Sequence, residues 1–140
     1  MPDSIITAAM QAAVGAEGDA QTAIVERGAI ERFAAAIGDD NPLFPDVAPP
    51  TFLRSLGRAI PALPDSETAP RVLDGGSEWS YGAPVRAGDA ITYATRLESL
   101  IERRGRMGPM LLATYLTEYV NQRGEMTASQ RNIIIRMPAA

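Results

Sequence analysis

Cysteine and histidine are both missing from this sequence. Without cysteine the chain has no disulfide bond, thiolate nucleophile or cysteine-ligated metal site, which fits a reducing compartment such as the cytoplasm. Without histidine it lacks the one side chain whose unperturbed pKa lies close to neutrality, and any histidine-ligated zinc or iron site. General acid–base catalysis at neutral pH therefore requires a different group, or one that another molecule provides.

Basic charge is also scarce. Lys and Arg together number 13 against 17 Asp and Glu, which gives a formal net charge of −4 and a pI of about 4.8. Such a chain repels phosphate backbones, so we expect no nucleic-acid partner. The apolar stretch Ile5–Met10 is too short for a secretion signal or a membrane span, so we expect a cytoplasmic protein without membrane association.

The remaining composition is that of a folded globular protein. Hydrophobic residues make up 46% and charged residues 21% of the 140 residues, which predicts one domain over residues 1–140. Residues 1–20 are rich in alanine and interrupted by Gly15 and Gly18. We expect them to form a loosely structured lead-in that includes a short helix.

Two segments have the apolar spacing of helices. Ile30, Phe33, Ala34 and Ile37 follow the i, i+3, i+4, i+7 pattern, which predicts a helix over Gly28–Ile37. A similar spacing predicts a second helix over Thr51–Ile60. Prolines mark both ends of this second segment, because Pro49 and Pro50 suit a first turn and Pro61 stops a helix.

The apolar period changes from helical to two after Arg71. Alternating and β-branched runs predict four strands, and glycine-containing turns are expected at residues 102–108 and 121–125. A short strand is also expected at 21–25. This order predicts an α+β architecture in which a curved antiparallel sheet wraps around the second helix, at about residues 51–60.

Several segments occur in the order found in one known family. Together they resemble the MaoC-like dehydratases, especially the N-terminal-type domains of that family. The segments are Asp39-Asp40-Asn41-Pro42-Leu43-Phe44, Ala48-Pro49-Pro50-Thr51-Phe52, Glu78-Trp79-Ser80-Tyr81 and Pro84-Val85-Arg86-Ala87-Gly88-Asp89.

The resemblance implies a hotdog fold whose central helix is Thr51–Ile60. Hotdogs of this family pair side by side into a continuous sheet, so a second hotdog chain is the expected partner. The acyl thioester, carried by coenzyme A or acyl carrier protein, lies in a tunnel at the pair interface. The implied reaction is hydration of a trans-2-enoyl thioester or its reverse, with no cofactor beyond the thioester substrate.

One substitution in the resembling motif bears directly on catalysis. The family pattern Asp-x-Asn-Pro-Leu/Ile-His places the catalytic aspartate at Asp39 and the histidine at Phe44. An Asp–His pair holds the attacking water and transfers its proton, which contributes on the order of 10²–10⁴-fold to rate, and phenylalanine can do neither. Read without the resemblance, Asp39–Pro42 is equally a helix-ending turn.

Candidate substrate-binding residues also follow from the resemblance. The start of the central helix offers backbone N–H groups to the thioester carbonyl, although Pro50 has none and only Thr51 and Phe52 remain. Arg104 and Arg106 could meet the phosphates of coenzyme A or an acidic carrier protein, or form a solvated hairpin turn. Trp79 could line the acyl tunnel or pack in the core. The full set is Asn41, Phe44, Pro50, Thr51, Phe52, Trp79, Arg104 and Arg106.

The segment between the motif and the second helix is short. Only Val47 separates Asp46 from Ala48, where the family usually has a helical segment. Its loss should widen the acyl site, which predicts a bulky acyl group such as a polycyclic or sterol-side-chain thioester.

Four functions stay open at this point. The chain is a subunit of an enoyl-thioester hydratase or 3-hydroxyacyl-thioester dehydratase whose partner supplies the Asp–His pair, or a self-sufficient homodimeric hydratase that uses Asp39. Alternatively it is a non-catalytic thioester-binding or structural protein, or a thioesterase that relies on a lone carboxylate.

Overall fold

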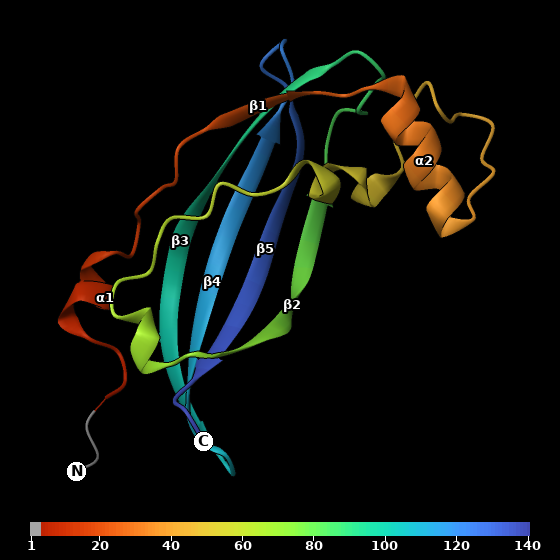
Figure 1. The fold of residues 1–140 in the computed structure, drawn as a ribbon. Helices are drawn as coiled ribbons and strands as arrows, with labels where there is room; N and C mark the ends of the chain where they lie inside the picture. The colour runs from red at the N-terminus through yellow and green to blue at the C-terminus, as the bar shows by residue number, and fades with distance from the viewer. Residues whose placement is uncertain (1–3) are drawn as a thin grey trace.

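The computed structural model describes residues 4–140, and a single curved sheet organises them (Figure 1). The sheet has five antiparallel strands in the order β1-β3-β4-β5-β2. The strands are β1 (Gln21–Ile24), β2 (Arg71–Tyr81), β3 (Ala90–Gly105), β4 (Gly108–Val120) and β5 (Met126–Met137).

The strands follow the period-two pattern of the sequence. On β3, for example, Ile91, Tyr93, Thr95 and Leu97 are buried, whereas Thr92 and Arg96 between them are exposed. The expected hairpin turn at 102–108 is shorter than predicted, because pairing continues to Gly105 opposite Gly108. Arg104 therefore lies on β3, and the turn itself consists of residues 106–107.

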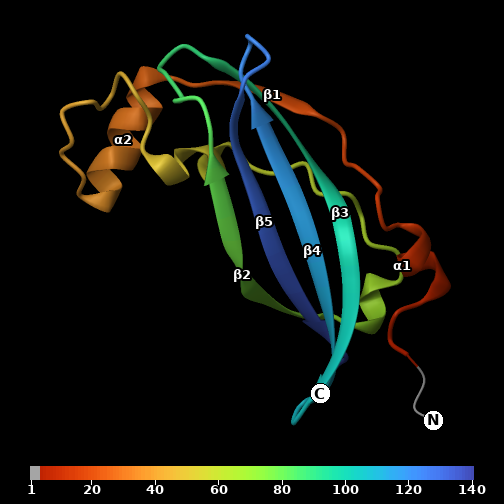
Figure 2. The same ribbon diagram turned by 180° about the vertical axis from the view of Figure 1, so that it is seen from behind.

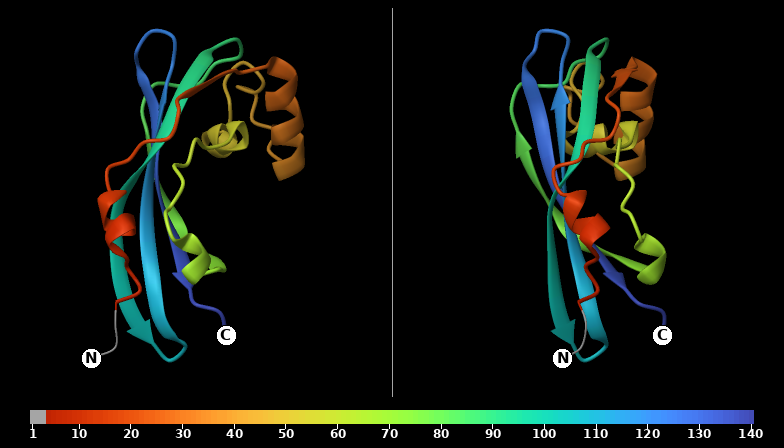
Figure 3. Two further views of the ribbon diagram at one scale, coloured as in Figure 1. Left: turned by 60° about the vertical axis from the view of Figure 1, so that its left-hand side comes forward. Right: turned by 90° about the vertical axis from the view of Figure 1, so that its left-hand side faces the viewer.

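Helical segments pack on the concave side of the sheet. They are α1 (Ala8–Ala12), α2 (Arg27–Ile37) and two 3-10 segments, η1 (Pro50–Leu56) and η2 (Ser66–Thr68). The side views show the sheet curving toward η1 and α2 (Figure 3). Seen from behind, the convex face of the sheet carries none of these segments (Figure 2).

The expected central helix over Thr51–Ile60 is wrong in type and length. The segment is the 3-10 helix η1, which ends at Leu56, and Gly57 follows with φ 107° and ψ −169°, a conformation that only glycine adopts readily. Residues 57–60 then run on without helical structure. The apolar spacing was compatible with an α-helix, but it could not report where the backbone leaves the helical region.

The first predicted helix is confirmed as α2. Its apolar face buries Ile30 and Ala34, and Phe33 contacts Phe52 of η1 edge-on at 5.7 Å between ring centroids. The helix ends at Gly38, which adopts φ 69° and donates its N–H back to the last turn, as expected of a glycine after a helix. This ending directs the following loop, which carries the Asp39–Phe44 motif, beside η1.

Residues 4–20 contain the short helix expected in this segment, α1, and pack against the sheet. Within α1, Met10 is fully buried against Leu97 and Leu111 on the sheet. Gly15 and Gly18 donate backbone hydrogen bonds to the carbonyls of Leu97 and Thr95, at 2.7 and 2.9 Å. The segment thus covers the part of the sheet around Leu97 and Leu111 and lies along part of the β3 edge. The alanine content of the segment does not predict this packing.

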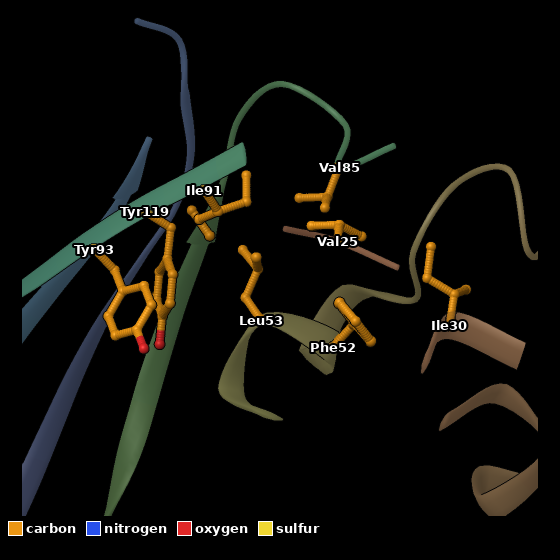
Figure 4. Close-up of a cluster of buried hydrophobic side chains, with 9 residues drawn as sticks. Val25, Ile30, Phe52, Leu53, Val85, Ile91, Tyr93 and Tyr119 are labelled. Atoms are coloured by element: carbon orange, nitrogen blue, oxygen red, sulfur yellow. The ribbon is translucent and has the colours of Figure 1, made fainter. Parts of the chain in front are cut away.

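Two apolar clusters form the core. The upper cluster joins η1, α2 and the strand ends through Phe52, Leu53, Ile30, Val25 and their neighbours (Figure 4). The lower cluster packs α1 and Leu63 against Leu97, Leu111 and Tyr115.

Strand β2 forms an edge of the sheet that pairs with no further strand among residues 4–140. It pairs only with β5, and nine of its 11 residues are exposed. The exposed side chains include Val72, Leu73 and Tyr81, each at least half accessible. An unpaired edge of this length is a surface that proteins usually cover.

Candidate functional site

The motif loop that follows α2 is built from two consecutive side-chain turns. The Asp39 carboxylate accepts the N–H of Asn41 at 3.0 Å, and the Asn41 side-chain oxygen accepts the N–H of Leu43 at 2.9 Å. Such bonds are what Asp and Asn form in turns. The loop is anchored at its far end by an ion pair between Arg27 of α2 and Asp46.

Asp39 and Asn41 are both exposed, and Phe44 is half-buried against the upper cluster. A shallow hollow of about 320 Å³ brings Asp39, Asn41 and Phe44 together beside α2. The side chain of Phe44, the position at which the resemblance predicts an imidazole, thus lines the same hollow as Asp39. In this chain the hollow is lined by three carboxylates, Glu31, Asp39 and Asp40, and by the Asn41 amide, and it has no imidazole because the sequence contains no histidine.

The start of η1 has fewer free amides than expected. The N–H of Phe52 donates to the carbonyl of Pro49 at 3.0 Å, so it closes the first helical turn. Pro49 and Pro50 have no N–H. Thr51 is therefore the one residue of the predicted pair whose amide stays available to a thioester carbonyl. Pro50 and Tyr81 also line an apolar hollow of about 270 Å³ between η1 and the end of β2.

Trp79 lies in a row of aromatic rings on the concave face. It stacks on Tyr81 at 5.8 Å and on Tyr119 at 6.0 Å, and Tyr119 contacts Tyr93 at 5.7 Å. The hydroxyl of Tyr93 donates to the carbonyl of Leu56 at 2.8 Å, which ties the end of η1 to this row. Burial raises the pKa of Tyr119 to about 12, so its hydroxyl is protonated at neutral pH. Trp79 thus packs against the neighbouring aromatic rings and also lines the concave surface of the sheet.

The structure does not bring Arg104 and Arg106 to the motif loop. Both lie around the β3–β4 turn, at the opposite end of the sheet from α2 and the loop that follows it (Figure 1). Arg104 pairs with Glu102 at 3.4 Å. Clustering in sequence suggested a phosphate site, but the length of β3 separates these residues from the motif.

A band of polar side chains crosses the concave face between the two apolar clusters, and sequence reasoning missed it. Its members, the polar band, are Thr95, Thr117, Gln130 and Asn132, all at most 3% exposed. The hydroxyls of Thr95 and Thr117 bond to each other at 2.7 Å. The sequence does contain an indication of this band, because Ala128, Gln130 and Asn132 are alternate residues of β5 and so share one face of the sheet. The apolar run at 133–135 obscures that pattern.

Arg58 lies over this polar band, just beyond η1. Its Nη1 donates to Oδ1 of Asn132. The amide of Asn132 donates in turn to Asp74 at 3.1 Å and to the carbonyl of Gly76 at 2.9 Å. Hydrogen bonds from the Gly76 N–H and from Asn132 hold the pKa of Asp74 below its ordinary value. The neutral amide of Asn132 thus holds Arg58 in place and links it to the carboxylate of Asp74.

Two further properties of the described chain bear on its chemistry. Among residues 4–140 no cluster of three acidic, His or Cys side chains is arranged to hold a metal ion. Over the same residues no helix is long and apolar enough to cross a membrane.

Comparison with known sequences points to one family. The sequence model described as "FAS1-like, dehydratase domain region" matches residues 12–130. A UPF0336 protein of Streptomyces coelicolor is 34% identical over 98 residues, which are 58% of this chain and 65% of that protein. A UPF0336 protein of Parafrankia sp. is 36% identical over 124 residues, or 74% of this chain and 78% of that protein. The chain thus spans less than two thirds of the Streptomyces relative.

Several solved structures have the same fold. The ChsH1-ChsH2 complex of Mycobacterium tuberculosis contains a chain that superposes with a TM-score of 0.74 at 16% identity, covering 94% of this chain and 93% of that one. A MaoC-like dehydratase of Rhodospirillum rubrum gives 0.65 at 20% identity, over 91% and 94%. The HadBC (3R-hydroxyacyl-ACP dehydratase) complex of M. tuberculosis gives 0.57 at 18%, over 84% and 95%.

These superpositions, together with the curved five-stranded antiparallel sheet of this chain, confirm the hotdog fold expected from the sequence. Because the sequence match extends over residues 12–130, this chain belongs to the FAS1-like dehydratase-region family, in its MaoC-like hotdog form.

Proposed function

We propose that this chain is one subunit of an enoyl-thioester hydratase, or of a 3-hydroxyacyl-thioester dehydratase working in the reverse direction. It shapes the acyl site, and a second hotdog chain supplies the Asp–His pair. The observation that carries the proposal is the motif loop, which keeps the Asp39–Asn41 turn but has Phe44 in place of the imidazole. Addition of water to the enoyl C3 and of a proton to C2 needs a group that exchanges protons near neutrality.

The open edge of β2 supports a paired state. Its exposed side chains include apolar ones, and the backbone groups of its 11 residues that do not pair with β5 face outward. Pairing with the matching edge of a second hotdog would continue the sheet and bring the partner's motif loop toward this chain's concave face. Two neighbours of this fold, ChsH1-ChsH2 and HadBC, are named as complexes.

The shortness of η1 supports a bulky acyl group, for example a polycyclic or sterol-side-chain thioester on coenzyme A or acyl carrier protein. Because η1 ends at Leu56, the concave face below it is not covered by a long helix. The segment between Asp46 and Ala48 is also minimal. Both features leave room beside Trp79 and Tyr81, whose parallel rings suit a broad apolar ligand.

The exposure of Asp39 favours a second candidate function. It is exposed in a hollow, and thioester hydrolysis or hydration by a lone carboxylate would need only such a residue. A homodimeric hydratase or thioesterase that uses Asp39, or a thioester-binding protein without turnover, would share the same fold. The three readings differ in whether the chain acts alone and in whether Asp39 matters.

The test is an enoyl-CoA hydration assay on the full chain, alone and co-expressed with a MaoC-like chain that keeps the motif histidine. A subunit role predicts turnover only in the pair, and Asp39→Asn in this chain leaves most of that rate intact. Turnover by the chain alone that is lost in Asp39→Asn would instead establish the self-sufficient enzyme. Release of free thiol identifies a thioesterase, and saturable binding without turnover in any pairing identifies a binding protein.

A further inference from the structure

Two arginines lie beside the open β2 edge, on the concave side of the sheet. Arg54 is on η1 and is exposed, and Arg58 follows two residues after η1 ends and is half-buried. The charges of both act on Asp74 of β2, so both side chains are near this strand. The start of η1 also lies beside the end of β2, where Pro50 and Tyr81 line one hollow (Figure 1). The two cations are therefore next to the edge at which a second chain would pair.

The nearby carboxylate of Asp74 does not pair with either arginine. It accepts hydrogen bonds from the N–H of Gly76 at 2.9 Å and from the amide of Asn132 at 3.1 Å. No carboxylate among residues 4–140 lies within 4.0 Å of the guanidinium of Arg54 or Arg58. Burial, followed by the charge of Arg54, lowers the pKa of Arg58, and the charge of Asp74 offsets only part of this effect.

An isolated exposed arginine needs no counter-ion, because water solvates it. Arg54 and Arg58 differ from that case, since Arg58 is already partly removed from water and the two charges repel each other. A chain that covers the β2 edge would remove more water from both. Dehydrating a cation costs free energy unless a hydrogen-bonded anion takes the place of the water. The covering chain is therefore expected to bring an anion with it.

A second copy of this chain is a poor source of that anion. Each copy would present two arginines and one carboxylate on the concave side of its edge, and that carboxylate already has two hydrogen-bond donors. Pairing two copies along β2 would thus place two surfaces with an excess of positive charge together, and like charges across an interface oppose association. A coenzyme A phosphate fits less well than a protein carboxylate, because the hollows beside α2 and η1 are lined by neither arginine.

We infer that Arg54 and Arg58 bind a carboxylate on the edge strand of the partner chain, and that this contact selects a different hotdog chain over a second copy. The inference rests on the proposed function, which pairs the partner along β2. The partner's strand would lie about 5 Å from β2, with its concave-facing side chains beside Asp74. The expected partner therefore has Asp or Glu at such a position, where the planar guanidinium of Arg54 can donate two parallel hydrogen bonds.

The test is a calorimetric titration of the full chain with the MaoC-like chain that keeps the motif histidine. Arg54→Gln should weaken the complex about tenfold, and Arg54→Glu about a hundredfold, because reversal adds repulsion to the loss of the pair. Arg54 is exposed, so neither change disturbs the core. Added salt should weaken the unaltered complex more than the Arg54→Gln complex, since the latter has lost the screened attraction.

Arg96→Glu is the matched control for Arg54→Glu. It makes the same change in net charge at an exposed arginine, but on β3, which β4 and β5 separate from β2. Its affinity for the partner should stay within about twofold of the unaltered chain, because an exposed pair such as Arg96–Glu118 contributes little. Thermal unfolding checks that both variants are folded. Replacing the acids of the partner's edge strand with arginine, one at a time, should restore binding to Arg54→Glu at one position.

Equal partner affinity of Arg54→Glu and Arg96→Glu, in a pair that forms and turns over substrate, overturns the inference and leaves the proposed function standing. Failure of the two chains to form any complex overturns the proposed function and the inference with it. Self-association of the unaltered chain as tight as the mixed complex contradicts the selection of a different chain. Loss of coenzyme A binding in Arg54→Glu, with partner affinity unchanged, would assign the arginines to the ligand and not to the partner.

Discussion

Tyr119 shows how burial of one hydroxyl sets the response of the chain to alkaline pH. Its pKa is raised to about 12 by desolvation, above the ordinary value of 10.0. The folded state therefore holds this proton more tightly than the unfolded state. The stability that results is fully present below pH 10 and is lost as pH rises toward 12.

Tyr119→Phe removes this ionisable group and should flatten the alkaline loss of stability. We expect the variant to lose roughly 1 kcal/mol less free energy of unfolding than the parent between pH 10 and 12. At neutral pH the two proteins should differ little, because the Tyr119 hydroxyl makes only a long bond of 3.4 Å to the carbonyl of Gly57. Urea unfolding followed by Trp79 fluorescence measures both quantities. An identical alkaline loss in the two proteins would show that Tyr119 ionises as it does in water.

Individual site residues were predictable to the extent that their role is local. The Asp39 and Asn41 turns follow from side chains that bond two residues ahead, so the motif segment was correctly expected to form a turn. Arg58 and Asn132, by contrast, are brought together only by the fold, because Arg58 follows η1 and Asn132 lies on β5, and no short-range pattern encodes such a contact. Arg104 and Arg106 illustrate the reverse error, since closeness in sequence did not place them at the site.

At the level of secondary structure, the end of η1 decides how much of the concave face is open. Gly57 at φ 107° and ψ −169° occupies a region that residues with a Cβ reach only with strain. Space is not the constraint, because an added Cβ would lie 3.5 Å from the Tyr93 hydroxyl, an ordinary contact. The break after Leu56 is thus a property of the backbone.

Gly57→Ala should destabilise the fold by about 1–3 kcal/mol through this backbone strain. Gly28→Ala, in the first turn of α2 where the glycine has ordinary helical geometry, is the matched control and should be neutral or slightly stabilising. Chemical denaturation of the two variants gives the comparison. An alanine at position 57 that is tolerated as well as one at position 28 would mean that the backbone at this position is not strained by a Cβ.

The strands and α2 were predictable from the sequence because their apolar periods match their burial. Ile30 and Ala34 are buried at the predicted helical spacing, and Tyr93 alternates with exposed neighbours on β3. The second helix failed because Leu53 and Leu56 fit the spacing of an α-helix and of a short 3-10 turn alike. Its true end depends on the conformation of Gly57 and on the hydrogen bond that the hydroxyl of Tyr93, on β3, donates to the carbonyl of Leu56.

For the whole molecule, the exposed β2 edge is the feature that most clearly anticipates another chain. Pairing along this edge should slow hydrogen exchange of the β2 amides that face outward, because they would gain partners in the second sheet. We expect protection of residues 71–81 to increase when the partner chain is added. Amides of β4, which are already paired on both sides, serve as the internal control and should not change. Unchanged exchange in β2 within a stable complex would place the interface elsewhere.

The measurement that tests the central claim most directly is the hydration rate of the reconstituted pair after the partner's motif histidine is replaced by alanine. Because this chain has no imidazole of its own, the account predicts a loss on the order of 10²–10⁴-fold, while Asp39→Asn in this chain has little effect. A pair that keeps its rate without the partner's histidine, or a chain that is fully active alone, would contradict the account.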